Sequence, residues 1–108
     1  MTEFERIDRF LAAFRGAGGR TESAFVTLGP GDDAAVLKST HPLAVTSDAV
    51  VEGVHFRRDW CTARQLGHKA LAVNLSDLAA MGARPVAFTC AVATPSSIDE
   101  GTFDEVAA

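Results

Sequence analysis

The stretch TARQLGHKALAVNLSDLAAMGARP, residues 62–85, decides the fold. It predicts a helix over residues 63–81, because Thr62 is a suitable N-cap and apolar side chains recur at three- and four-residue spacing. Gly82 takes the position after the helix and Pro85 follows shortly, which is a typical stop signal. Because apolar residues cover much of the circumference, we expect this helix to be largely buried.

Shorter elements are expected on both sides of this helix. A capped helix near the N-terminus is indicated by Thr2, followed by the apolar stripe Phe4, Ile7, Leu11 and Phe14. A capping box at residues 97–100 predicts a last helix. Strands are expected at residues 25–28, 34–37, 43–47 and 86–93. The predicted fold class is α+β: a small, mainly antiparallel or mixed sheet with helices packed on one face.

Composition excludes several classes of protein. The chain has 108 residues, which is enough for one domain at most. Its net charge is −4. No apolar run approaches the roughly 20 residues of a membrane helix, and the N-terminus is not a secretory signal. Without a basic stripe, neither nucleic acid nor membrane is an expected partner. We expect a cytoplasmic protein in which Cys61 and Cys90 are reduced thiols.

Asp77 is the most informative acidic residue. It lies on a helical row that is otherwise apolar, and a buried carboxylate loses several kcal/mol of hydration unless it is paired or bound to metal. Capping of a loop or pairing with an arginine are the structural alternatives. A metal ligand or catalytic carboxylate is the functional one. Asn74, one turn earlier, is a further oxygen ligand type.

Other acids follow expected turns and strand ends. Asp32 and Asp33 follow Gly31 in a turn, and Asp48 follows two hydroxyl residues at the end of a predicted strand. Each position alone also suits an ordinary turn or a polar strand terminus. Together with Asp77 they predict a Mg²⁺ site that handles phosphates without a P-loop.

Three segments carry a resemblance to a known family: GPGDDAAVL (29–37), TSDAVVEGVHF (46–56) and GHKALAVNLSDLAAMGARP (67–85). In these the chain resembles the thiamine-monophosphate kinase family, within the superfamily that includes aminoimidazole ribonucleotide synthetase. The resemblance covers nearly the whole chain. It departs from the family pattern at Pro30, where an aliphatic residue is usual, and at Ala49, where a threonine often stands.

The resemblance implies transfer of the γ-phosphoryl group of ATP to thiamine monophosphate, giving thiamine diphosphate, with several Mg²⁺ ions. The attacking phosphate oxygen is already ionised, so no dedicated general base is expected. The residue roles that it implies are Mg²⁺ ligation by Asp33, Asp48 and Asp77, further oxygen ligands from Thr46 and Ser47, supporting or additional metal contacts from Asp32 and Asn74, and contact with thiamine monophosphate by His55.

The resemblance also implies an assembly. We expect residues 1–108 to be the N-terminal ATP- and Mg²⁺-binding domain of a longer chain, inactive without its C-terminal domain, and to pair into a homodimer through the N-terminal sheet. Two alternatives remain. One is a Mg-ATP-dependent enzyme of the same superfamily with another substrate, and the other is a non-catalytic metal- or nucleotide-binding dimerisation module.

Overall fold

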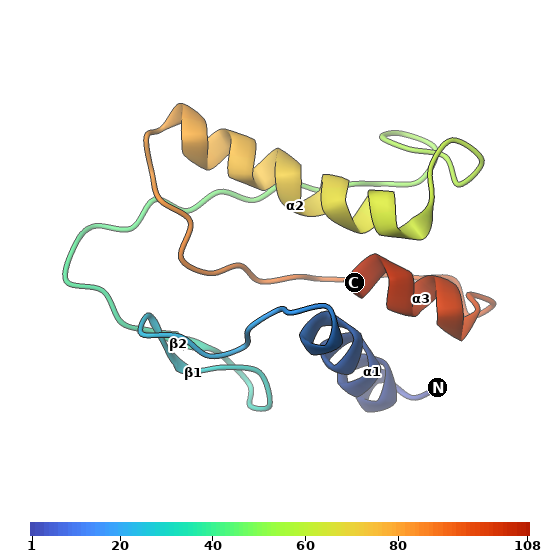
Figure 1. Ribbon diagram of the computed structural model, residues 1–108, viewed down its shortest axis with the longest axis horizontal. Coiled ribbons are helices and arrows are strands. Elements are labelled where there is room, and N and C mark those ends of the chain that lie inside the picture. The colour runs from blue at the N-terminus through green and yellow to red at the C-terminus, as the bar shows by residue number, and fades with distance from the viewer.

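Three helices and a two-stranded sheet make up the regular structure of the computed structural model, which describes residues 1–108. In chain order the elements are α1 (Glu3–Gly16), β1 (Val26–Leu28), β2 (Val36–Leu37), α2 (Ala63–Ala80) and α3 (Glu100–Ala107). Two long extended segments flank α2 in the chain: residues 38–50 lead from β2 and pass behind α2, and residues 83–95 lead from the end of α2 toward α3 (Figure 1). The predicted α+β class is confirmed. No helix has the length and apolar character that crossing a membrane requires.

Reciprocal capping boxes start the two longer helices. The Glu5 amide donates to the Thr2 hydroxyl over 3.2 Å, and the Thr2 amide donates to the Glu5 carboxylate over 2.6 Å. Thr62 and Gln65 make the same pair of bonds at the start of α2. Each box satisfies two amides that a helix start would otherwise leave unpaired. Gly82 follows α2 with a φ of 65°, in the left-handed region that favours glycine, so both ends of this helix are confirmed.

The N-cap of the last helix lies two residues after Ser97, the first residue of the predicted capping box. Its N-cap is Asp99, whose carboxylate accepts from the backbone amide and the hydroxyl of Thr102. The Ile98 amide donates to the Pro95 carbonyl, so residues 95–98 form a turn. A helix therefore cannot start at Ser97, and the next residue with a capping side chain takes that role.

The sheet is a short antiparallel hairpin. Val26 pairs with Leu37 and Leu28 with Val36, with an irregularity between the two pairs. The turn between the strands contains Gly31 at φ 124°, a conformation in which a side chain would be strained. The predicted glycine turn before Asp32 and Asp33 is thus confirmed, and the sheet extends no further than these two strands.

The core lies where α3 packs against the other two helices. Phe103 and Ala107 of α3 are the only buried residues, and the Phe103 side chain is 4% exposed. The Phe103 ring meets the Phe10 ring of α1 edge to face, with centroids 6.0 Å apart. On the other side α3 approaches α2 so closely that a Cβ at Gly67 would collide with the carbonyl of Val106. The helices therefore pack on one another, not on a face of the sheet.

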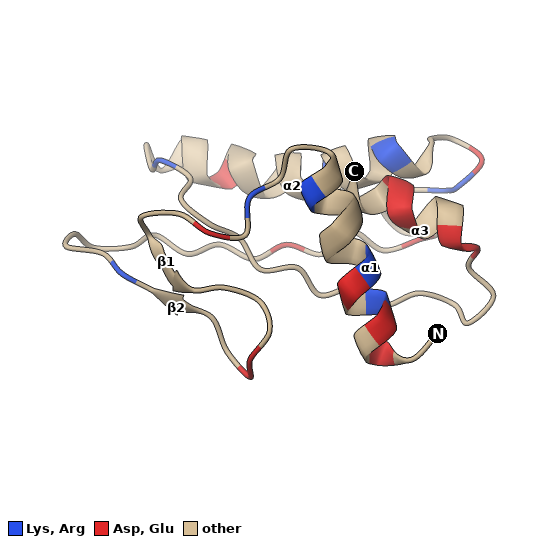
Figure 2. Cartoon of the chain, turned by 60° about the horizontal axis from the view of Figure 1, so that its bottom comes forward, with Lys and Arg blue, Asp and Glu red and all other residues tan.

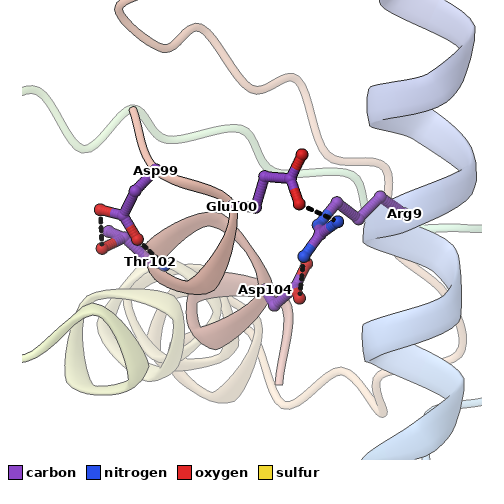
Figure 3. Close-up of polar contacts among 5 residues, drawn as sticks. All are labelled: Arg9, Asp99, Glu100, Thr102 and Asp104. Carbon is purple, nitrogen blue, oxygen red and sulfur yellow. Dashed lines mark hydrogen bonds and ion pairs between the residues drawn. The ribbon is translucent and has the colours of Figure 1, made fainter. Parts of the chain in front are cut away.

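Ion pairs fix α1 against α3. Arg9 donates to both oxygens of the Asp104 carboxylate, over 2.6 and 2.7 Å, and to Glu100 over 2.7 Å (Figure 3). The two-pronged contact matches the planar fork of the guanidinium. The hydrogen bond to Asp104 raises the pKa of Arg9 above its ordinary value. This contact joins residues from opposite ends of the chain.

Two predicted strands and one prediction of burial are wrong. Residues 43–47 and 86–93 are extended but have no strand partner, and α2 has no buried residue. The radius of gyration is 14.7 Å, against about 13 Å for a compact chain of this length. An extended segment becomes a strand only when a neighbour offers a ladder of hydrogen bonds, and neither segment has one.

Candidate metal site

The extended segment 38–50 brings a hydroxyl against the helix that carries Asp77. The Thr46 hydroxyl donates to the Asp77 carboxylate over 3.3 Å. Asp77 is exposed, so the expectation that it lies in a core is wrong. The residues of its row toward the start of α2, Leu66, Ala70 and Val73, are half-buried, whereas Asp77 is exposed. Asp77 and Thr46 are the two predicted ligands that the structure places together.

The other predicted carboxylates remain separate. Asp32 and Asp48 each accept a 2.8 Å hydrogen bond from the amide of the next residue, a local arrangement common in turns. Asp33 and Ser47 are exposed. The acidic tip of the β1–β2 connection projects away from α2 (Figure 2). No three acidic, histidine or cysteine side chains gather closely enough to hold a metal ion.

Asn74 lies three residues before Asp77 on α2 and is half-buried. Its side-chain nitrogen donates to the Ala70 carbonyl over 2.9 Å. This bond fixes the orientation of the amide and leaves its oxygen free to accept or to ligate. Its predicted supporting role is therefore compatible with its position on the helix.

His55 lies in a tight turn before α2. Its Nδ1 accepts from the Val51 amide over 2.9 Å, so the ring proton sits on Nε2, which can donate to a ligand. The Lys69 ammonium donates to the His55 carbonyl over 2.6 Å and ties this turn to α2. The sequence patterns did not single out Lys69. No spacing rule points to Lys69, and its role is seen only in the folded contact with His55.

The loop of residues 51–61 is held by its own ion pairs. Arg57 donates to both oxygens of Asp59 over 3.0 Å, and Arg58 donates to Glu52 over 2.7 Å. The Arg57 guanidinium also lies 5.2 Å from the centroid of the Trp60 ring. Sequence reasoning missed Trp60, although a lone tryptophan directly after three charged residues was a visible signal.

The donors at Asp77 fit a magnesium ion that is shared with phosphates. Mg²⁺ is usually held by one or two carboxylates together with substrate phosphates and water. Its ligands lie at about 2.1 Å in an octahedron, so neighbouring oxygens stand about 3 Å apart. The 3.3 Å between the Asp77 and Thr46 oxygens is close to that spacing. The pair suits a hard cation and offers no sulfur or nitrogen for a softer one.

One surface hollow lies away from these residues. It has a volume of about 440 Å³ and sits between the end of α1 and β1, where Arg15 donates to the Thr21 hydroxyl. None of the predicted site residues lines it. Asp77 itself is exposed, so the candidate site is an open surface along α2.

Comparison with known families adds to this geometry. The family model described as "AIR synthase related protein, N-terminal domain" matches residues 31–108. The chain belongs to this family. The match includes every predicted ligand and the His55 turn, and it confirms the resemblance to the superfamily.

Curated proteins match at high identity. The thiamine-monophosphate kinase of Mycobacterium tuberculosis is 43% identical over 95 residues, which is 87% of this chain and 27% of that protein. The Escherichia coli enzyme of the same name is 48% identical over 91% of this chain and 29% of its own length. That of Corynebacterium glutamicum is 48% identical over 70% and 24%.

The chain spans about a quarter of the length of these curated relatives. No solved structure matches it significantly.

Proposed function

We propose that residues 1–108 are the N-terminal, Mg²⁺- and ATP-binding domain of a kinase that converts thiamine monophosphate and ATP to thiamine diphosphate and ADP. The observation that carries this proposal is the 43–48% identity to enzymes named thiamine-monophosphate kinase. Their greater length supports a further domain in the complete protein. The open surface along α2 fits this reading, because a second domain and the nucleotide would cover it.

The roles of the chain's own residues follow from their chemistry. Asp77 and Thr46 hold Mg²⁺ in this proposal, with Asp33, Asp48 and Ser47 as further oxygen ligands and Asp32 and Asn74 in support. When bound, the ion neutralises phosphate charge and orients the groups for in-line transfer. His55 donates from Nε2 to thiamine monophosphate. The attacking phosphate oxygen is ionised at neutral pH, so these residues position groups and need not remove a proton.

Exposed apolar side chains favour a homodimer as the assembly. Residues 43–54 and 86–92 leave several of them uncovered, and Val45 is 89% exposed. A second copy that pairs with the extended segments would complete their hydrogen bonds and cover these side chains. Use of ATP and the two free thiols, Cys61 and Cys90, favour the cytoplasm as the location.

The decisive test uses the product of the complete reading frame. It is incubated with thiamine monophosphate and Mg-ATP, and thiamine diphosphate is measured by chromatography. Product formation establishes the substrate. A folded protein that binds ATP and forms no product would contradict the proposal and favour a superfamily enzyme with another acceptor.

A variant at Asp77 tests the metal site. Asp77→Asn keeps the size of the side chain but weakens a hard cation's ligand, so we expect turnover to fall at least about a hundredfold, equivalent to about 2.7 kcal/mol. Because Asp77 is exposed, the far-UV circular dichroism spectrum should be unchanged. Glu105→Gln on α3 removes another exposed carboxylate and serves as the control. Near-normal turnover of Asp77→Asn would exclude Asp77 as a ligand.

A further inference from the structure

Residues 46–55 run beside α2 in the opposite direction and are tied to it at two points (Figure 1). At one point the Thr46 hydroxyl donates to Asp77. At the other the Lys69 ammonium donates to the His55 carbonyl over 2.6 Å. The segment that carries His55 is therefore fixed on the same helix as the proposed metal site.

The His55 turn, residues 51–56, is closed by its own backbone hydrogen bonds. The His55 amide donates to the Val51 carbonyl, and the Gly53 amide donates to the Phe56 carbonyl, each over 2.8 Å. Gly53 has a φ of 80°, in the left-handed region that favours glycine. The Val51 amide donates to Nδ1 of His55, so the imidazole is fixed to the backbone of the turn. Any movement of the turn therefore moves the ring.

Lys69 makes the only hydrogen bond between the loop of residues 51–61 and α2. The ion pair of Arg58 with Glu52 lies within the loop, as do the other polar side-chain contacts of these residues. Lys69 forms no ion pair, so its ammonium has no competing carboxylate. A hydrogen bond from a charged donor is also stronger than a neutral one. The place of the turn on the helix therefore depends on Lys69.

We propose that Lys69 is a positioning residue for thiamine monophosphate, which acts by fixing the His55 turn on α2. In the proposed function His55 donates to the substrate and Asp77 binds the metal. With the turn fixed, one helix carries both groups, and the turn need not be ordered when the substrate binds. This inference rests on the proposed function. It goes further by giving a role to a lysine that touches neither the metal nor the substrate.

The test compares Lys69→Met and Lys69→Arg in the product of the complete reading frame. Methionine keeps an apolar stem and removes the donor, so we expect the KM for thiamine monophosphate to rise about 3–10-fold. The kcat and the KM for ATP should stay within about twofold of the wild type, because the lost contact serves the ground state and the transition state alike. Arginine should restore most of the affinity, because its guanidinium also donates to a carbonyl.

A double-mutant cycle shows whether Lys69 acts through His55. His55→Ala removes the substrate contact itself, so adding Lys69→Met should raise the KM for thiamine monophosphate no further. A second rise of the same size would mean that Lys69 acts independently, and it would overturn the inference. An unchanged KM in Lys69→Met alone, or in His55→Ala alone, would do the same.

Lys38→Met is the matched control. Lys38 is the other lysine of the chain, it is also exposed, and it lies directly after β2. Its loss should leave the KM values for both substrates unchanged.

Limited digestion with trypsin tests the hold on the turn without any reaction. Trypsin cuts after Arg57 and Arg58, which adjoin the turn, when the loop opens locally. Cleavage at these two sites, followed by mass spectrometry, should be about 3–10-fold faster in Lys69→Met than in the wild type. Equal rates would overturn the inference.

The outcomes separate this inference from the proposed function. Thiamine diphosphate made by the wild type upholds the function whatever Lys69 does. If the wild type makes none, the function fails, and equilibrium dialysis with thiamine monophosphate tests Lys69 by itself. Weaker binding to Lys69→Met than to the wild type supports positioning. Equal binding, or no binding to either protein, overturns it.

Discussion

The three helices and the two extended segments of this chain differ in what holds them. The helices have capped starts, the only buried side chains and the Arg9 ion pairs. Residues 38–50 and 83–95 have no strand partners and expose most of their apolar side chains, yet one of them carries Thr46 and Asp48. The helical part supports itself, whereas the part that carries much of the site depends on what binds to it.

The largest effect is expected in the helical core. Phe103→Ala should lower the free energy of unfolding by about 3–5 kcal/mol, because it removes the buried ring of α3 that packs against Phe10 of α1. Urea unfolding followed by far-UV circular dichroism measures the change. The matched variant in an extended segment is Phe88→Ala. Phe88 is 50% exposed and its ring meets the Phe14 ring nearly at a right angle, so about 1 kcal/mol is expected there. Equal losses would remove the distinction between the two regions.

A smaller effect tests the closeness of α2 and α3. Alanine normally stabilises a helix by about 1 kcal/mol relative to glycine. At Gly67 the new Cβ would strike the Val106 carbonyl, so we expect Gly67→Ala to destabilise by about 1–3 kcal/mol. Gly101→Ala in α3 meets only the Asp99 carboxylate, at 3.4 Å, and should be neutral or stabilising. Thermal unfolding of both variants gives the signs, and stabilisation by Gly67→Ala would disprove the close approach.

The smallest effect concerns pH and the start of α3. The hydroxyl and amide of Thr102 lower the pKa of Asp99. A carboxyl whose pKa is lowered in the folded state stabilises the fold at pH values above its unfolded pKa of about 3.9. This contribution is lost as the pH falls through the folded pKa. Asp99→Asn keeps an effective cap but does not titrate. The melting temperature should therefore drop more between neutral and acidic pH for the wild type than for Asp99→Asn. Equal drops in the two proteins would contradict this.

The helix starts were predictable because their signals are local. Thr62 and Gln65 are three residues apart, as are Thr2 and Glu5, and the left-handed Gly82 adjoins the helix that it ends. The start of α3 was misplaced because Asp99 competes with Ser97 for the same role, and a turn at Pro95 decides between them. Such competition is settled by neighbouring backbone hydrogen bonds, which residue types alone do not specify.

The site was only partly predictable because its geometry is non-local. The meeting of Thr46 with Asp77 follows from a segment running beside α2, which no spacing rule encodes. The apolar row around Asp77 predicted burial, but Leu66 and Val73 are only half-buried and Asp77 is exposed. The roles of Asp33, Asp48 and His55 remain predictions from residue chemistry and resemblance.

The contact of Arg9 with Asp104 has a consequence for synthesis on the ribosome. The two residues are 95 positions apart, so α1 emerges long before its partner helix exists. At about 5–20 residues per second, that interval is roughly 5–20 s. A 14-residue helix is marginal in water without tertiary packing. During this time the nascent chain presents Phe10 and the neighbouring apolar stripe to chaperones, and the fold can close only when residues 99–107 have left the exit tunnel.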